Sequence, residues 1–118
     1  MKKIIIVLFV VVLAIFGYAI FTSADSKDVL TKKIYCVFNK EKSCYDLGVH
    51  FLEDKTYDLN SSIVFFDKSC NLNNPLACNH LGYIYQIGAA NKPDINKAKE
   101  YYQKGCDKGL ALACNNNG

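Results

Sequence analysis

Residues 78–106, CNHLGYIYQIGAANKPDINKAKEYYQKGC, decide the fold, because an earlier segment of the chain repeats their pattern. That segment is residues 44–70, CYDLGVHFLEDKTYDLNSSIVFFDKSC, and its Leu47-Gly48 aligns with Leu81-Gly82 of the later copy. The later copy is two residues longer, and the extra residues fall in its loop GAANKP. An insertion confined to a loop leaves the flanking segments in register, so the two copies describe one repeated structural unit.

The cysteines mark the period of this repeat. Cys36 and Cys70 are 34 positions apart, and Cys70 and Cys106 are 36 apart. A period of this length with apolar residues at helical spacing indicates an all-α fold, a short α/α solenoid of stacked helix pairs. We expect helices over residues 27–38, 41–53, 58–71, 75–87 and 94–108, followed by a short one over 110–117.

Small residues recur where the paired helices are expected to touch. Gly48 and Ser62 of the first copy align with Gly82 and Ala98 of the second. Side chains of this size would let two helices approach closely. Asp94 follows a proline at the start of the fifth expected helix, where its carboxylate can cap the exposed backbone amides.

The N-terminal segment differs in character from the repeats. Lys2 and Lys3 precede an uncharged apolar run over residues 4–21, and Thr22, Ser23 and Ala24 follow it. This pattern predicts either a signal peptide cleaved after Ala24 or a membrane anchor through residues 4–21. Both alternatives place residues 25–118 across the membrane from the cytoplasm, in the periplasm or outside the cell. The domains we expect are the segment 1–24 and a repeat domain 25–118, with repeats at about 36–69 and 70–105 and a terminal cap at 106–118.

The charge of the chain does not favour nucleic acid as a partner. The net charge is +3 over 118 residues, and the part after residue 24 contains 12 lysines, no arginine and 11 acidic residues. This near balance gives no basic patch, and arginine, the residue that most often reads base edges, is absent.

All six cysteines fall into three pairs with one spacing of eight positions: Cys36 with Cys44, Cys70 with Cys78, and Cys106 with Cys114. An even number of cysteines in a small exported domain indicates disulfides. Eight residues of continuous helix span about 12 Å, whereas a disulfide needs Cα atoms within about 7 Å. Each pair can therefore close only where the chain folds back, and turn-forming residues stand between the members of every pair: Asn39, Asn73-Asn74-Pro75 and Gly109.

We therefore predict three disulfides, each across a helix–turn–helix corner. Each should contribute about 2–3 kcal/mol by the entropy of the loop that it closes. The rival use of the cysteines is zinc binding, but zinc sites prefer two to four residues between paired thiolates. We expect no metal and no cofactor.

The run LACNHLGYIYQIG, continued by DINKAKEYYQKGCDKGLALAC, resembles Sel-1-like repeats, which are relatives of the tetratricopeptide repeat. The recurring pairs of cysteines eight positions apart are similar to those of a narrower group, the cysteine-rich exported proteins first grouped in Helicobacter. The first copy departs from the pattern, with Ser43 for alanine, Phe51 for tyrosine and no glycine at the position of Gly88. The resemblance implies a right-handed superhelix of antiparallel helix pairs, with disulfides that connect neighbouring repeats.

Members of that family are often labelled β-lactamases or penicillin binders, and the serine enzymes among such proteins need a catalytic motif. No serine has a lysine three positions later, and Ser-Asp-Asn and Lys-Thr-Gly are absent. His50 and His80 occupy non-equivalent repeat positions, and we interpret both as surface or half-buried residues. We identify no catalytic residue, and a β-lactam-hydrolysing or penicillin-binding protein stays as an alternative that only the resemblance implies.

Binding of a protein or peptide is the function that the pattern favours. Solenoids bind partners on a concave face built from the first helix of each repeat, here residues 41–53 and 75–87. The candidate binding residues on these helices are Tyr45, Asn79, Tyr83 and Gln86, because they offer rigid aromatic area and amides that can pair with a backbone. The other interpretations of these positions are plain solvated surface and packing against the next helix. A third alternative for the whole protein is a periplasmic immunity or inhibitor protein that neutralises a secreted toxin.

The sequence Asp58-Leu59-Asn60-Ser61-Ser62 also matches an acidic sequon for bacterial N-glycosylation. Asp58 aligns with Asp94, so a helix cap would explain the same residues without a glycan.

Overall fold

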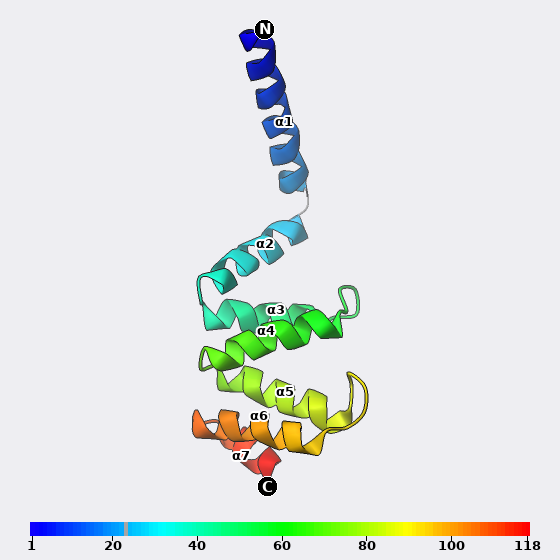
Figure 1. Cartoon of the computed structure of the whole chain (residues 1–118), viewed down its shortest axis with the longest axis vertical. Coiled ribbons are helices and arrows are strands. Elements are labelled where there is room, and N and C mark those ends of the chain that lie inside the picture. Colours follow the sequence, from blue (N-terminus) through cyan, green and yellow to red (C-terminus); the bar gives the residue numbers. More distant parts are fainter. Residues whose placement is uncertain (23) are drawn as a thin grey trace. The chain divides into compact units, whose positions relative to one another are not determined.

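The computed structural model describes residues 1–22 and 24–118, without the side chains of residues 19–26. Within these residues the chain forms seven α-helices and no strand, which confirms the all-α prediction (Figure 1). The helices are α1 (Lys2–Thr22), α2 (Ala24–Val37), α3 (Glu41–His50), α4 (Leu59–Asn71), α5 (Pro75–Ile87), α6 (Ile95–Asp107) and α7 (Ala111–Asn117).

The chain divides into two compact units, Met1–Thr31 and Lys32–Gly118. The first unit contains the apolar helix α1, whose described large apolar side chains are exposed. The expected cleavage after Ala24 lies outside the residues that are fully described. Within the described part of the chain, no helix is both long enough and apolar enough to cross a membrane.

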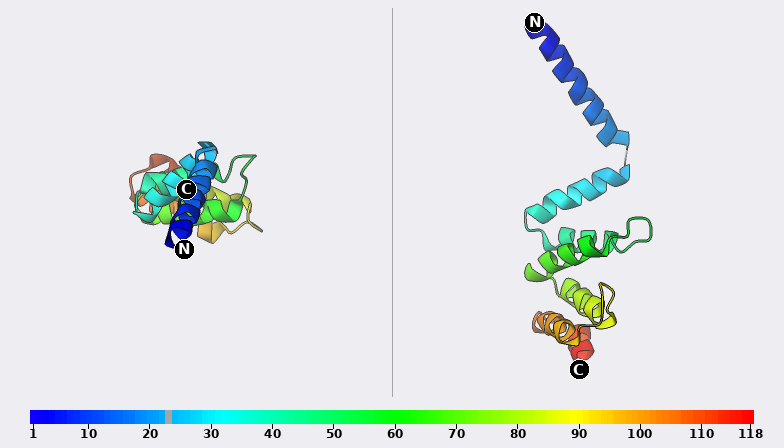
Figure 2. Two further views of the ribbon diagram at one scale, coloured as in Figure 1. Left: turned by 90° about the horizontal axis from the view of Figure 1, so that it is seen from above. Right: turned by 45° about the vertical axis from the view of Figure 1, so that its right-hand side comes forward.

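The second unit is the repeat domain. Its helices α3 to α7 follow one another in a stack, and neighbouring helices run antiparallel (Figures 1 and 2). Helix α3 pairs with α4 and α5 pairs with α6, while α4 also packs on α5 and α6 on α7. This alternation of pairing and stacking is the short α/α solenoid that the period predicts.

Three corners of the repeat domain share one backbone design. The third residue after the first cysteine of each pair takes a left-handed conformation, with φ of 61° at Asn39, 73° at Asn73 and 95° at Gly109. Asparagine and glycine tolerate this conformation better than other residues. The chain folds back at each corner, and the Cα atoms of the paired cysteines lie 4.6–4.8 Å apart. All three predicted disulfides are present.

Glycine allows the two helices of each repeat to touch. A Cβ atom built on Gly48 would lie 2.5 Å from the ring of Phe66, and one on Gly82 would lie 2.5 Å from the ring of Tyr102. The Ser62 hydroxyl also donates a hydrogen bond of 2.7 Å to the Gly48 carbonyl across the first pair. The small residues therefore permit the close approach that the sequence predicts.

The core runs continuously from one repeat into the next. It is formed by buried side chains of α4, α5 and α6: Phe66, Cys70, Ala77, Cys78, Leu81, Ile84 and Tyr101. Because Cys70 and Cys78 belong to this core, the disulfide between them is buried together with the aromatic and aliphatic side chains around it.

Helix α3 differs from its expected length. We predicted it over residues 41–53, but it ends at His50, whereas α5 ends at Ile87 as expected. Helix α5 is followed by Gly88, whose φ of 71° is the left-handed conformation common at the C-terminal ends of helices. The first repeat has no glycine at this position, and its chain leaves the helix earlier through a turn.

Candidate protein-binding site

An open hollow of about 500 Å³ lies on the repeat domain where α5 meets the loop between α3 and α4 and the end of α7. Ten residues line it: Leu52, Tyr57, Leu59, Asn79, His80, Tyr83, Ile84, Ile87, Ala89 and Asn116. None of these side chains is an acid, a lysine or an arginine. The hollow is therefore an apolar surface with a few neutral polar groups, which is typical of a binding site for an uncharged segment.

Helix α5 supplies the floor of the hollow. Asn79, Tyr83 and Ile87 follow one another at intervals of four residues, so they lie on one face of the helix. Tyr83 is 56% exposed and Ile87 is 52% exposed. Two large side chains next to each other on an open surface provide contact area at low cost in conformational entropy.

The walls of the hollow come from other elements. Tyr57, from the loop before α4, is 61% exposed, while Leu52 and Leu59 beside it are half-buried. On the opposite side, the Asn116 amide of α7 donates a hydrogen bond of 2.9 Å to the Asn79 side-chain oxygen. This bond connects the terminal helix to the floor of the hollow.

His80 is held in place by aromatic residues of the first repeat. Its Nε2 atom lies 3.1 Å from the Tyr45 hydroxyl, and its ring stacks on Phe66 with centroids 4.9 Å apart. Burial lowers the pKa of His80 below its usual value of 6.5, so the imidazole is neutral at pH 7. The hollow consequently carries no charge from histidine at neutral pH.

These groups can bind a peptide by two kinds of contact. The apolar floor can accept a large aliphatic or aromatic side chain, because the hollow is several times larger than one side chain. The amides of Asn79 and Asn116 also line the hollow, where they can exchange their mutual hydrogen bond for bonds to a peptide backbone. The arrangement offers recognition of an extended, uncharged segment.

The structure places the four sequence-predicted binding residues in three different settings. Asn79 and Tyr83 line the hollow, and Tyr45 lies behind it through its contact with His80. Gln86 instead accepts a hydrogen bond of 2.6 Å from the Tyr102 hydroxyl and lines a separate, smaller hollow of about 180 Å³. The binding role of all four residues stays a prediction.

Of the ten residues that line the hollow, only Asn79 and Tyr83 were predicted from the sequence to bind a partner. Ile87 could have been found from the interval of four residues that it continues from Tyr83. Tyr57 gave no such signal, because it belongs to a loop whose path the repeat period does not specify. His80 aligns with Asp46 of the first copy, and without a counterpart in that copy it was interpreted as a surface or half-buried residue.

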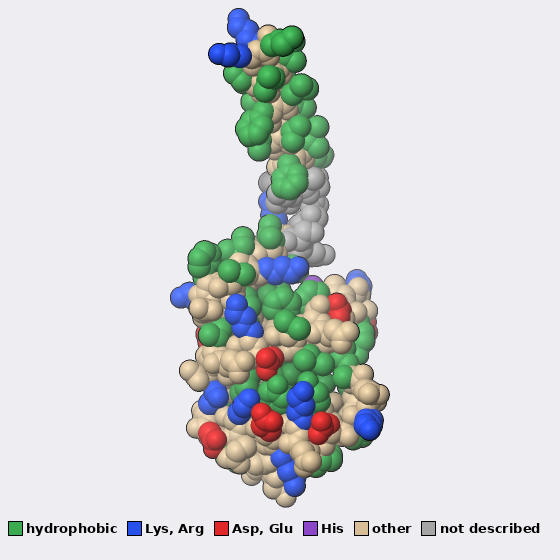
Figure 3. All heavy atoms as spheres, in the orientation of Figure 1, with side chains coloured by type: hydrophobic (Ala, Val, Ile, Leu, Met, Phe, Trp, Pro, Cys, Tyr) green, Lys and Arg blue, Asp and Glu red, His purple; other side chains and the backbone are tan. Residues whose placement is uncertain are grey.

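A second hollow, of about 420 Å³, lies at the loop between α5 and α6 and contains charged groups. Lys97 extends over the Tyr85 ring there, with its Nζ atom 4.6 Å from the ring centroid. On the face of the repeat domain shown in Figure 3, basic and acidic side chains are interspersed without a patch of one sign. Among the described residues, no group of three or more His, Cys, Asp or Glu side chains is arranged to hold a metal ion.

The acidic sequon has a structural role at the start of α4. The Asp58 carboxylate accepts hydrogen bonds from the Ser61 backbone amide at 3.1 Å and from the Ser61 hydroxyl at 2.7 Å. These bonds hold the pKa of Asp58 below its usual range, because they stabilise the charged carboxylate. The cap therefore confirms the structural interpretation of Asp58, and Asp94 caps α6 in the same way at 3.0 Å from the Lys97 amide.

The fold and the three disulfides define the class of this protein as a disulfide-bonded α/α solenoid. A comparison with protein-family models matches the Sel1 repeat twice, at residues 41–74 and 75–110. The chain belongs to the Sel1 repeat family. The matched repeats begin with α3 and α5, so each contains one complete helix pair. No curated protein matches the chain.

Two general statements follow from the family and the disulfides. Sel1 repeats generally mediate interactions between proteins. Three disulfides in a domain of this size indicate an oxidising extracellular or periplasmic environment.

Proposed function

We propose that the protein is an exported scaffold that binds a protein or peptide partner in the hollow formed by α5, the loop before α4, and α7. Tyr83 and Ile87 provide the main apolar contact, and Asn79 provides hydrogen bonds to the backbone of the partner. The partner presents an extended, uncharged segment with at least one large apolar side chain.

One observation carries this proposal: the hollow is apolar, open and lined from both repeats and the terminal helix. Exposed apolar clusters on soluble domains commonly mark interaction sites. The N-terminal apolar segment and the disulfides support export, because both are typical of proteins that leave the cytoplasm.

The test is affinity capture from native cell envelopes with the oxidised protein as bait. The matched pair of variants is Tyr83→Ala, inside the hollow, and Val64→Ala, which removes an apolar side chain of α4 that is 63% exposed and outside the hollow. Both changes leave the core untouched, so circular dichroism spectra and unfolding midpoints should stay close to those of the unchanged protein.

We expect a partner that is retained by Val64→Ala and weakened about tenfold by Tyr83→Ala, since truncating a central aromatic residue commonly costs 1 kcal/mol or more. Calorimetry with the recovered partner measures this ratio. A partner that binds all three proteins equally would place the binding surface elsewhere and would contradict the proposal.

A further inference from the structure

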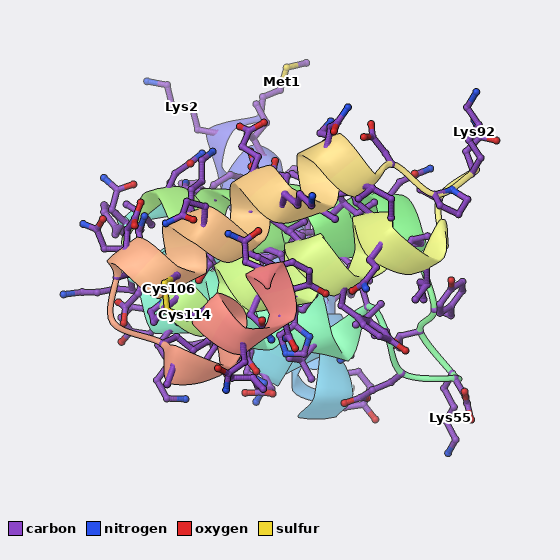
Figure 4. All side chains as sticks on the ribbon, turned by 90° about the horizontal axis from the view of Figure 1, so that it is seen from below. Met1, Lys2, Lys55, Lys92, Cys106 and Cys114 are labelled. Carbon is purple, nitrogen blue, oxygen red and sulfur yellow. A yellow bond between two sulfur atoms is a disulfide. The ribbon has the colours of Figure 1, made fainter. Side chains whose placement is uncertain are left out.

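The three disulfides differ in their exposure to solvent. Cys36, Cys44, Cys70 and Cys78 are each at most 2% exposed, so two of the disulfides are buried. In the third, Cys106 is half-buried and Cys114 is exposed. Figure 4 shows this bond beside α7, at the edge of the ribbon.

The helix that this bond holds has few other attachments. Helix α7 contains only seven residues, Ala111–Asn117, and a helix of this length is not stable alone. Its buried contact is Ala113, which is packed so closely that a Cβ on Gly105 would lie 2.9 Å from its methyl group. Two exposed amide hydrogen bonds add to this contact, from Asn116 to Asn79 and from Asn117 to Gln103.

We propose that the Cys106–Cys114 bond is a site of thiol–disulfide exchange with a dithiol, and that its reduction releases α7. The two buried bonds do not react under the same conditions, because a thiolate must reach a sulfur atom in order to attack it. The chemical class of the reagent is a dithiol, and the protein need not unfold for the reaction.

The exchange proceeds in two balanced steps. A thiolate of the dithiol attacks the Cys114 sulfur, the bond to Cys106 breaks, and Cys106 leaves as a thiolate that takes up a proton. The second thiol of the reagent then displaces Cys114 from the mixed disulfide. The protein gains two electrons and two protons, and the reagent leaves as its own disulfide.

Release of α7 would change the binding hollow, a consequence that rests on the proposed function. Asn116 of α7 lines the hollow and is bonded to Asn79 on its floor. Without the disulfide, the seven-residue helix would lose order and this wall of the hollow would be lost. Reduction of one exposed bond would thereby weaken the partner complex while the two complete repeats remain folded.

The first experiment is native-state reduction of the unchanged protein with dithiothreitol, followed by alkylation at timed intervals and peptide mass mapping. We expect Cys106 and Cys114 to be labelled at least about tenfold faster than the other four cysteines, equivalent to about 1.4 kcal/mol in opening free energy. If a buried pair is labelled first, or all six cysteines react together, the exchange site is refuted.

A double variant separates this result from a general loss of stability. In Cys106→Ala/Cys114→Ala, the two remaining disulfides should resist dithiothreitol as they do in the unchanged protein, and hydrogen exchange should increase only in α7. Rapid labelling of Cys70 and Cys78 in this variant would show that the exposed bond protects the whole domain, which contradicts selective exchange.

Partner binding distinguishes the two proposals. If the selectively reduced protein and the double variant both bind the recovered partner about tenfold more weakly, as the loss of about 1.4 kcal/mol would cause, release of α7 controls the hollow. If the labelling order is as expected but binding is unchanged, that control is refuted. If the hollow has no partner at all, the proposed function fails, while the labelling result still decides the exchange site.

Discussion

The two complete repeats use one framework and differ in how their helices are connected. Phe51 stacks on Phe65 in the first repeat with ring centroids 5.7 Å apart, and Tyr85 stacks on Tyr101 in the second at 5.6 Å. The second repeat has Gly88 after α5 and is two residues longer in total, and α5 is three residues longer than α3.

Both loops nevertheless close with the same hydrogen bond. The Asp58 amide donates to the Phe51 carbonyl at 2.8 Å, and the Asp94 amide donates to the Tyr85 carbonyl at 2.9 Å. The contacts between the two helices therefore fix the helix pair, whereas the connection between them differs from one repeat to the other. The extra length of α5 carries Ile87, which contributes to the candidate binding hollow.

The largest effect should come from removing the aromatic ring that both repeats place on a glycine. Phe66→Ala should lower the free energy of unfolding by about 3–5 kcal/mol, because it leaves a cavity at a fully buried position. Tyr102→Ala should have a similar effect in the second repeat. Urea denaturation measures both losses. A cost below about 1 kcal/mol for Phe66→Ala would show that the contact between its ring and Gly48 does not hold the helix pair together.

The same pairing can be examined with a compensating change. Gly48→Ala alone should cost about 1–3 kcal/mol, since its methyl group would overlap the Phe66 ring. In the Phe66→Ala background the methyl group enters the cavity instead, so the combined loss should be at least 0.5 kcal/mol smaller than the sum. Simple additivity of the two losses would contradict direct contact.

The loop of the second repeat should be sensitive at one position that the first repeat lacks. Gly88→Ala should cost more than the 1–2 kcal/mol of a left-handed alanine, because its Cβ would also lie 2.5 Å from the Pro93 nitrogen. The matched control is Gly109→Ala, where φ is 95° and no atom lies within 4 Å of the added Cβ. Equal losses in thermal unfolding would show that the loop tolerates the overlap.

A smaller effect should distinguish Tyr101 from its first-repeat counterpart Phe65. The Tyr101 hydroxyl donates a hydrogen bond of 2.9 Å to Asp67, which connects the second repeat to the first. Tyr101→Phe should cost about 0.5–1.5 kcal/mol. Tyr83→Phe, on the open surface, should change stability by less than about 0.5 kcal/mol. Urea midpoints compare the two variants. An equal effect on stability would mean that the hydrogen bond between Tyr101 and Asp67 does not stabilise the protein.

The smallest effect should appear as a dependence of stability on pH. The folded-state pKa of His80 is lowered by burial, so the unfolded chain binds a proton more readily. The stabilising contribution is complete above about pH 6.5, the unfolded value, and is lost as the pH falls through the lower folded value. The lining of the hollow contains no acidic group, since its polar members besides His80 are tyrosines and asparagines.

Unfolding midpoints between pH 7 and pH 5 test this dependence. His80→Gln should flatten the decline in that range, and His50→Gln makes the same substitution at the other histidine, whose Nδ1 lies 3.8 Å from a Glu53 oxygen. A decline that His80→Gln leaves unchanged would assign the pH dependence to other groups.

Most of the fold could be predicted from the sequence, because the repeat encodes it locally. The spacing of cysteines around Asn39, Asn73 and Gly109 specifies the corners, and the aligned Gly48 and Gly82 specify the approach of helices. These features depend on residues close in the chain or at equivalent positions. We predicted α3 to continue to residue 53, because the first repeat has no glycine like Gly88 to mark the end of its first helix.

The candidate site was less predictable, since it depends on contacts between elements distant in the chain. Asn79 and Tyr83 could be selected from the first helix of the second repeat. The contribution of Tyr57 depends on the path of an irregular loop, and that of Asn116 depends on how α7 packs against α5. Neither has a signal in the spacing of residues, so the hollow became visible only with the stacked helices.

Binding at the hollow is tested most directly by hydrogen exchange of the oxidised protein with and without its recovered partner. We expect protection on binding to be concentrated in residues 51–59 and 79–89, which include most of the hollow, with little change in α4 and α6 beyond their first turns. Protection confined to α4 and α6, with the hollow unchanged, would contradict binding by the face that α5 presents.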